Sequence, residues 1–164
     1  STSRRQRQMC IRDSEMDCDF SHNPDDLLRL TAELEAGADV AVGSRYSKGV
    51  TVVNWPMSRL LMSYCASRYV RIVTGMPVCD ATAGFVGYKR EVLAAIDFDR
   101  IEMVGYGFQI EMKYTAWKMG FRIGEVPIIF ADRTEGTSKM SGGIFGEAFF
   151  GVLALPFRTI ARKK

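Results

Sequence analysis

Short apolar segments alternate with amphipathic helical segments along most of this sequence, and this alternation constrains the fold more than any other feature. The pattern predicts strands over residues 39–43, 82–88 and 122–130, and helices over residues 24–36, 56–74, 90–96 and 107–119. Pro127 falls inside the last strand, which favours an edge position or a bulge. Because strands that alternate with helices form sheets covered by helices, the sequence predicts an α/β fold with a mostly parallel sheet flanked by helices.

The opening segment, residues 1–14, reads as foreign sequence. Residues 4–14 match one translated frame of a sequencing-library transposase adapter. We therefore exclude residues 1–14 from the fold, as we would exclude a tag or a fusion scar. We expect the remaining chain to begin inside a single domain that lacks its N-terminal strands, with the end of one strand at residues 15–18.

Excluding this segment also changes the charge. The sequence has 22 Lys and Arg against 19 Asp and Glu, and residues 1–14 hold four Arg and one Asp, which leaves 18 basic and 18 acidic residues. This balance gives no indication of a nucleic-acid partner. Cys18, Cys65 and Cys79 remain without a CxxC spacing, which fits a reducing compartment and argues against a zinc site. No apolar run reaches the roughly 18 residues that suggest a transmembrane helix.

Two aspartates, Asp17 and Asp19, follow the predicted strand end and precede a predicted helix. They would lie at the carboxyl edge of the sheet, where open α/β sheets bind ligands. Carboxylates at such an edge can hold Mg²⁺ or Mn²⁺, which neutralises a bound diphosphate. A solvated turn is an equally good interpretation of the pair taken alone. A calcium loop is excluded, because His22 stands where that loop requires Gly and Leu28 stands where it requires a bidentate Glu.

The two aspartates begin a longer series of motifs. The series comprises Asp17-Cys18-Asp19-Phe20-Ser21-His22-Asn23-Pro24, Gly43-Ser44-Arg45-Tyr46, Trp55 with Arg59 and Ser63, Asp80-Ala81-Thr82-Ala83-Gly84-Phe85, Gly105-Tyr106-Gly107-Phe108-Gln109-Ile110-Glu111, Glu125-Val126-Pro127-Ile128, Asp132-Arg133 and Gly136-Thr137-Ser138-Lys139. In this order and at these spacings it resembles the dolichol-phosphate (polyprenyl-phosphate) mannose synthases, which are inverting glycosyltransferases of family 2 with the GT-A fold. Residues 15–140 would then be the C-terminal part of a GT-A catalytic domain.

The resemblance implies transfer of mannose from GDP-mannose to a polyprenyl (dolichyl) phosphate, with inversion. It implies that Asp17 and Asp19 are catalytic and bind the donor diphosphate and its Mg²⁺ or Mn²⁺, with Ser21 as a looser metal contact. It also implies an acceptor phosphate site formed by Arg45, Arg59, Ser63, Arg133 and Lys139. Two positions depart from the family: Cys18 stands where Ala is more common, and Ser21 stands where some members have Gln.

Several polar residues have two interpretations. Asp80, Gln109 and Glu111 could bind the donor sugar, or they could satisfy backbone and arginine partners within the fold. The only histidine, His22, could cap a turn or contact substrate. The proposed chemistry needs no strong base, because a phosphate monoester with a second pKa of about 6 is largely deprotonated at neutral pH. Two phosphate-bearing substrates repel each other, so arginines, which bind phosphate at two points, suit the acceptor side.

The C-terminal segment, residues 141–164, is rich in Phe and ends in basic residues. It predicts an amphipathic helix, limited by Pro156, that lies at a membrane interface. The alternative is a helix that packs on the domain or on a partner subunit. With a lipid-linked acceptor, we expect a peripheral protein on the cytoplasmic face of a membrane.

Three functional hypotheses follow from the sequence. The first is the polyprenyl-phosphate mannosyltransferase. The second is a glucosyl or N-acetylhexosaminyl transferase to the same lipid, because the strands expected before residue 15 help to select the base and sugar. The third is a nucleotide-sugar or carbohydrate binding module without turnover. We expect the polypeptide as given to be inactive by itself, because those strands also hold the base.

Overall fold

The structure is a computed structural model that describes residues 12–17, 19, 21–131 and 142–163. Its centre is a sheet of β1 (Arg12–Glu15), β4 (Val86–Lys89), β2 (Val40–Ser44) and β5 (Ile123–Pro127), in that spatial order. β4 runs antiparallel to β1 and β2, and β2 pairs parallel with β5. Three of these four strands therefore point the same way, as predicted, and β5 with its proline lies at an edge of this sheet.

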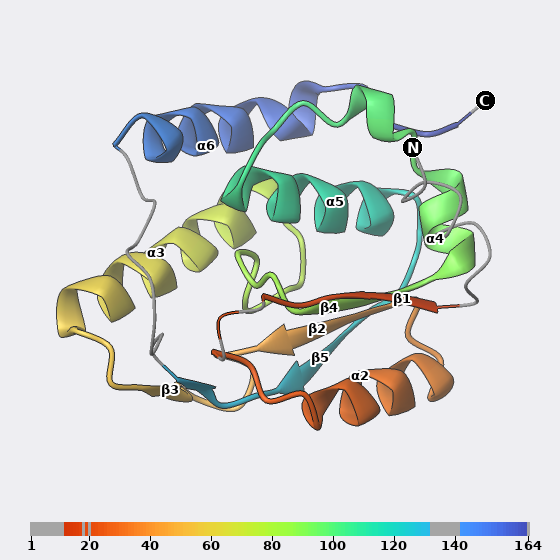
Figure 1. Cartoon of the computed structure of the whole chain (residues 1–164). Coiled ribbons are helices and arrows are strands. Elements are labelled where there is room, and N and C mark those ends of the chain that lie inside the picture. Colours follow the sequence, from red (N-terminus) through yellow and green to blue (C-terminus); the bar gives the residue numbers. More distant parts are fainter. Residues whose placement is uncertain (1–11, 18, 20, 132–141, 164) are drawn as a thin grey trace.

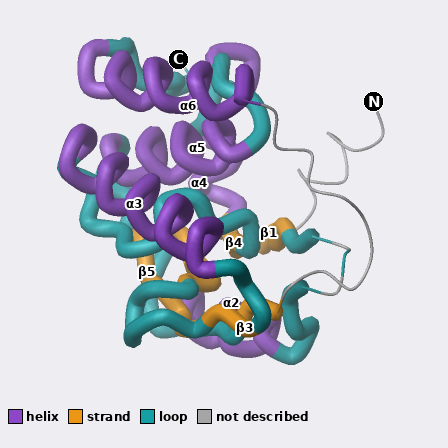
Figure 2. The backbone as a smooth tube through the Cα atoms, turned by 90° about the vertical axis from the view of Figure 1, so that its left-hand side faces the viewer, coloured by secondary structure: helices purple, strands orange, loops and turns teal. Residues whose placement is uncertain are grey.

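Helices cover both faces of the sheet (Figure 1). One face is covered by α2 (Asp26–Glu35), and the other by α5 (Tyr106–Lys118) with α4 (Arg90–Ala95). Beyond α5 lies α6 (Gly142–Ala154), which contacts both α5 and α3 (Met57–Thr74). Figure 2 shows the resulting order of layers: α2, the sheet, α5 and then α6. Among the described residues, none of the helices combines the length and hydropathy needed to span a bilayer.

Short elements complete the described fold. A second, two-stranded sheet pairs β3 (Val52–Val53) parallel with β6 (Phe130–Ala131). One 3₁₀ turn, Phe98–Arg100, follows α4, and another, Leu155–Phe157, follows α6. Pro156 lies in the second turn, so α6 ends just before the proline, as its missing N–H requires.

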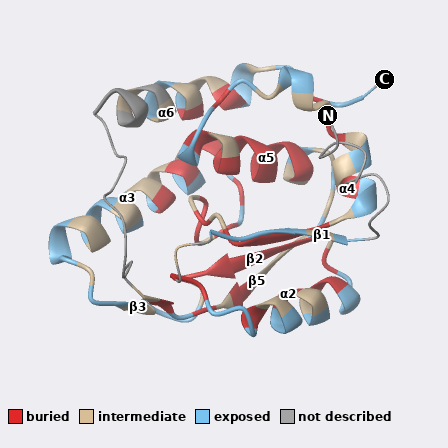
Figure 3. Cartoon of the chain, viewed as in Figure 1, coloured by how far each residue is buried: buried red, intermediate tan, exposed pale blue. Residues whose placement is uncertain are grey.

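The core lies between the sheet and α5. Figure 3 shows α5 as almost entirely buried, and nine of its residues from Gly107 to Ala116 are buried. On the opposite face, Leu30 and Leu34 of α2 pack against Phe85. Gly43 in β2 also faces Phe85, and a Cβ at this position would lie only 2.9 Å from the phenyl ring. Glycine is therefore needed there for the close approach of β2 and the loop before β4.

The predicted helices over residues 56–74, 90–96 and 107–119 agree with α3, α4 and α5 within a residue or two. The helix predicted from residue 24 instead begins at Asp26. Asn23 still caps this region, because its carbonyl accepts from the Asp26 N–H and its side chain accepts from the Asp25 N–H, both at 3.1 Å. The turn at Pro24 and Asp25 thus precedes the helix proper.

Three strand predictions need correction. Of the segment 82–88, only residues 86–88 belong to a strand, β4, because residues 80–85 turn around a buried carboxylate. The segment 122–130 divides into β5 and β6. At the N-terminus, β1 spans Arg12–Glu15 instead of residues 15–18, and so includes residues that we excluded from the fold. Strand pairing uses backbone groups, so this segment can pair with β4 whatever the origin of its side chains.

Candidate active site

The site residues gather at one edge of the central sheet. Asp17 and Asp19 follow β1, and Arg45 follows β2 directly. Both strands run antiparallel to β4, so their carboxyl ends share this edge. It is the edge at which open α/β sheets bind ligands.

The acidic side of the site consists of Asp17 and Asp19. The Asp17 carboxylate is exposed, and its Oδ2 atom lies beside Gly84, where a Cβ would be 3.8 Å away. Asp19 is partly buried, and its Oδ1 atom accepts from the backbone N–H of Ser21 at 3.1 Å and from the Ser21 hydroxyl. The described residues contain no group of three or more His, Cys, Asp and Glu side chains suited to a metal. Two carboxylates with a nearby hydroxyl nevertheless fit Mg²⁺ or Mn²⁺, which prefer oxygen ligands and take others from water and substrate phosphates.

His22 lies near the aspartates and packs against two aromatic rings. Its ring is 5.0 Å from the Phe85 ring and 4.9 Å from the Phe130 ring. Burial lowers the pKa of His22, and this effect outweighs the attraction of the nearby Asp17 and Asp19 charges. His22 is therefore neutral at physiological pH and adds no charge to the site. The described ring contacts of His22 are thus packing contacts, a role different from both the turn cap and the substrate contact considered from the sequence.

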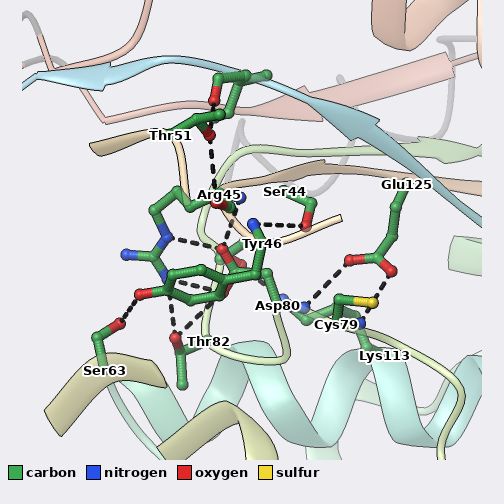
Figure 4. Close-up of polar contacts among 12 residues, drawn as sticks. Ser44, Arg45, Tyr46, Thr51, Ser63, Cys79, Asp80, Thr82, Lys113 and Glu125 are labelled. Carbon is green, nitrogen blue, oxygen red and sulfur yellow. Dashed lines mark hydrogen bonds and ion pairs between the residues drawn. The ribbon is translucent and has the colours of Figure 1, made fainter. Parts of the chain in front are cut away.

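A buried ion pair holds Arg45. The Asp80 carboxylate is fully buried and accepts from Arg45 Nε at 2.6 Å, from Nη2 at 2.7 Å and from the backbone N–H at 3.0 Å (Figure 4). Burial alone raises the pKa of Asp80, but the hydrogen bonds and charge of Arg45 outweigh it and hold the pKa below its usual value. Thr82 adds a further acceptor for Nη2 at 2.9 Å. Of the two interpretations of Asp80, the structure therefore favours the one in which its carboxylate satisfies an arginine.

Aromatic rings bring Arg45 and Arg59 together. The Trp55 ring centre lies 5.4 Å from the Arg45 Cζ atom and 4.2 Å from the Arg59 Cζ atom. Both distances allow favourable contact between a guanidinium and an aromatic ring. Ser63, one turn along α3 from Arg59, accepts a 2.8 Å hydrogen bond from the Tyr46 hydroxyl. The structure therefore brings three of the predicted acceptor residues into one cluster.

Phe130 joins the acidic side to this cluster. Its ring contacts His22, lies 5.3 Å from the Trp55 ring and has the Arg45 Cζ atom 5.6 Å from its centre. Asp17 and Asp19 act electrostatically on His22, as does Arg45. The carboxylates and the arginine thus lie near the same pair of rings, those of His22 and Phe130.

The remaining predicted residues have different positions. Glu111 is buried on α5, and its Oε2 atom accepts from the backbone N–H groups of Glu102 and Met103 at 3.0 and 2.8 Å, so it satisfies backbone donors. Gln109 is buried, and its Oε1 atom has no hydrogen-bond donor in the part of the chain that the structure describes. Arg133 and Lys139 lie outside the described residues.

Two residues to which the sequence analysis assigned no role support the loop that carries Asp80. Glu125 on β5 accepts from the backbone N–H groups of Cys79 and Asp80 at 2.8 and 3.1 Å. Lys113 on α5 is fully buried and donates to the Ala83 carbonyl at 2.5 Å. Together they fix the 79–85 loop that presents Asp80 to Arg45 (Figure 4). The sequence could have predicted the burial of Lys113, because the helix that contains it has apolar residues on every side and therefore no polar face for a lysine.

Lys113 predicts a dependence of stability on alkaline pH. Burial lowers its pKa to about 7; nearby Asp80, Glu15 and Glu125 oppose this and Arg45 adds to it. Between about pH 7 and the unfolded pKa of about 10.4, the unfolded chain binds a proton that the folded chain does not. The free energy of unfolding should therefore rise with pH, by at most about 1.4 kcal/mol per pH unit.

We expect Lys113→Met to remove this rise, measured by urea unfolding at pH 7, 8 and 9. Lys118→Met changes an exposed lysine of the same helix and should leave the slope unchanged. Parallel pH profiles for the wild type and Lys113→Met would contradict the prediction.

The fold, with its paired aspartates and clustered arginines at one sheet edge, is that of the GT-A glycosyltransferases. The chain belongs to glycosyl transferase family 2, whose model matches residues 15–97. It is similar in fold to glucosyl-3-phosphoglycerate synthase from Mycobacterium tuberculosis in complex with phosphoglyceric acid. That match has a TM-score of 0.64 and 15% identity and covers 90% of this chain and 50% of the other. The same enzyme in complex with Mn²⁺ and UDP-glucose gives a TM-score of 0.56 at 16% identity, covering 88% and 47%.

Curated relatives have higher sequence identity. The polyprenol monophosphomannose synthase of Mycolicibacterium smegmatis is 49% identical over 138 residues, covering 84% of this chain and 52% of the relative. The undecaprenyl-phosphate mannosyltransferase of Micrococcus luteus is also 49% identical over 138 residues, covering 84% and 56%. The dolichol-phosphate mannosyltransferase of Pyrococcus furiosus is 34% identical over 129 residues, covering 77% and 35%. The chain spans about half the length of the first two relatives.

Proposed function

We propose that this chain forms the acceptor-binding part of a polyprenyl-phosphate mannosyltransferase, which transfers mannose from GDP-mannose to a polyprenyl phosphate with inversion. The observation that carries this proposal is the cluster of Arg45, Arg59 and Ser63. The rings of Trp55 and Phe130 lie beside this cluster, and Phe130 also contacts His22, which lies near the two aspartates. Such a site suits two phosphate-bearing substrates that meet over one sugar. The names of the three relatives support both the sugar and the lipid acceptor.

In the proposed reaction, an oxygen of the acceptor phosphate attacks the anomeric carbon of mannose. A bond between carbon and this oxygen forms, while the bond to the donor diphosphate breaks and its electron pair leaves with the nucleoside diphosphate. The phosphate is already deprotonated near neutral pH, with a second pKa of about 6, so no side chain needs to remove a proton. This agrees with a site whose only histidine is neutral and packed between aromatic rings.

Charge compensation is then the main task of the site residues. Two unit charges of the same sign about 4 Å apart repel by roughly 4 kcal/mol at an effective dielectric constant near 20. We propose that Arg45 and Arg59 bind the acceptor phosphate and orient it toward the sugar. Asp17 and Asp19, with Ser21, would hold Mg²⁺ or Mn²⁺, which when bound neutralises the leaving diphosphate. The Mn²⁺ and UDP-glucose of the structural neighbour support a divalent ion in this role.

Transfer of labelled mannose from GDP-mannose to a short-chain polyprenyl phosphate, by the complete gene product that contains this chain, tests the proposal. We expect a lipid-linked mannose product that forms only with Mg²⁺ or Mn²⁺ present. A product from UDP-glucose or UDP-N-acetylglucosamine but not from GDP-mannose would favour the glucosyl or N-acetylhexosaminyl transferase. Tight nucleotide-sugar binding without any product would favour a binding module.

We also propose that α6 lies against a membrane while it packs on the domain. One side of this segment is buried on the protein through Val152 and Leu155. Phe150 of α6 and Phe157 of the 3₁₀ turn that follows it are 69% and 90% exposed. The exposed basic residues Arg162 and Lys163 follow, and these would attract anionic lipids. A peripheral contact of this kind would bring the site to an acceptor whose lipid tail stays in the bilayer.

The double variant Phe150→Ser/Phe157→Ser should weaken binding to vesicles that contain anionic phospholipid. Burial of one phenylalanine is worth about 1.5–3 kcal/mol, so we expect at least a tenfold weaker vesicle affinity. Leu28→Ser removes a 75% exposed leucine from α2, on the opposite face of the sheet, and should leave binding unchanged. Equal losses for both variants would show that α6 is not the contact surface.

A further inference from the structure

Tyr46 connects the end of β2 to the helix that carries Ser63. Its hydroxyl donates to the Ser63 Oγ atom at 2.8 Å, and its ring meets the Tyr64 ring edge-on, with centres 5.4 Å apart. The same ring lies close to the Arg45 guanidinium, whose Cζ atom is 5.3 Å from the ring centre. Tyr46 is itself buried. One side chain thus contacts two of the residues assigned to the acceptor phosphate.

The hydrogen bond from Tyr46 determines what Ser63 can do. A serine hydroxyl has one proton to donate and two lone pairs that accept. Because Ser63 accepts from Tyr46, its own proton is directed away from Tyr46 and is available to an anionic oxygen. Burial raises the pKa of the Tyr46 phenol, and this exceeds the opposing effect of the Arg45 charge. The phenol therefore remains a donor at neutral and mildly alkaline pH.

We propose that Tyr46 is a positioning residue for the acceptor phosphate, acting through Ser63, whose hydroxyl proton it orients toward that phosphate. This inference rests on the proposed function, because it takes Ser63 to be an acceptor ligand. The ring of Tyr46 adds to this role by packing on Tyr64 and beside Arg45, so α3 and the end of β2 keep a fixed separation. The role concerns the lipid phosphate alone and leaves the donor side unaffected.

The test compares the wild type with Tyr46→Phe, Ser63→Ala and the double variant, all in the complete gene product. A neutral hydrogen bond is worth about 0.5–1.5 kcal/mol, so Tyr46→Phe should raise the KM for polyprenyl phosphate about three- to tenfold. The KM for GDP-mannose and kcat should stay within about twofold. In the Ser63→Ala background, Tyr46→Phe should have little further effect, because the group through which it acts is already gone.

Tyr69→Phe is the matched control. It also removes a tyrosine hydroxyl that donates a hydrogen bond between two elements, here from α3 to the Phe149 carbonyl of α6 at 3.0 Å, but Tyr69 lies outside the acceptor cluster. It should leave the KM for polyprenyl phosphate unchanged. Equal KM increases for both tyrosine variants, or fully multiplicative effects of Tyr46→Phe and Ser63→Ala, would indicate a general structural role and overturn the proposal.

Direct binding of the short-chain polyprenyl phosphate separates this inference from the proposed function. If the wild type binds the lipid phosphate without turnover, the transferase assignment fails, and Tyr46→Phe should still weaken binding about three- to tenfold. Active wild type with unchanged acceptor KM and affinity in Tyr46→Phe would overturn the positioning role alone. A wild type that neither binds the lipid phosphate nor turns over would overturn both.

Discussion

Asp19→Asn should lower mannose transfer by about 10²- to 10³-fold, because it removes one negative charge from the predicted metal site. A bound divalent ion supplies several kcal/mol of charge stabilisation to a leaving diphosphate, and roughly 3–4 kcal/mol corresponds to that loss of rate. The fold should tolerate the change, since the asparagine side-chain oxygen can still accept from the Ser21 N–H as Asp19 does. The measurement is kcat/KM for labelled mannose transfer by the complete gene product, together with an Mn²⁺ titration.

Asp25→Asn is the matched control for this variant. Asp25 is an exposed aspartate that lies just before α2, and its substitution changes the net charge by the same amount. We expect it to retain wild-type activity and Mn²⁺ dependence. If Asp19→Asn kept its activity within threefold and required no more Mn²⁺ than the wild type, the metal assignment of Asp19 would be wrong.

Asp80→Asn should destabilise the fold by about 3–5 kcal/mol, because it leaves the buried Arg45 guanidinium without its counter-charge. Both carboxylate oxygens of Asp80 bind this arginine, and the carboxylate is fully buried. Urea unfolding followed by circular dichroism at pH 7 measures the change. Lys89→Met breaks the partly exposed pair with Asp39 at 3.1 Å and should cost less than about 1 kcal/mol.

The double variant Arg45→Met/Asp80→Asn should recover much of the stability lost in Asp80→Asn, because it removes the uncompensated charge. It should nevertheless remain inactive, since the arginine is also proposed to bind the acceptor phosphate. If the single and double variants were equally destabilised, loss of packing would explain the effect better than the unpaired charge does.

The ion pair between Arg45 and Asp80 also predicts how the stability of the fold changes at acidic pH. The pKa of Asp80 is lowered in the folded state, so its contribution to stability is complete above the unfolded pKa of about 3.9 and is lost as pH falls through the folded pKa. The wild type should therefore have a higher free energy of unfolding than Asp80→Asn at neutral pH, and this difference should disappear only below about pH 4. A difference that disappeared between pH 7 and 5 would point to another titrating group.

Much of the fold followed from local patterns. The helices over residues 57–74 and 106–118 were predicted closely, because their length and apolar content distinguish them from strands. The aspartates and arginines were recognised from motif order, since each motif is short and contiguous. The predicted boundaries of β4 and β1 were wrong. A strand ends where it stops pairing with its neighbour, and that neighbour lies far away in the sequence.

The class of fold, the position of the paired aspartates after a strand and the charge types suited to two phosphates all follow from local sequence patterns. Which of these residues meet depends on the packing of the chain. Arg45 and Asp80 are 35 positions apart, and Tyr46 reaches Ser63 across 17. Their pairing depends on how α3 and the 79–85 loop pack against the sheet. Buried charges such as Lys113 and Asp80 take their protonation and their partners from that packing, because desolvation acts on a group only after the chain has enclosed it.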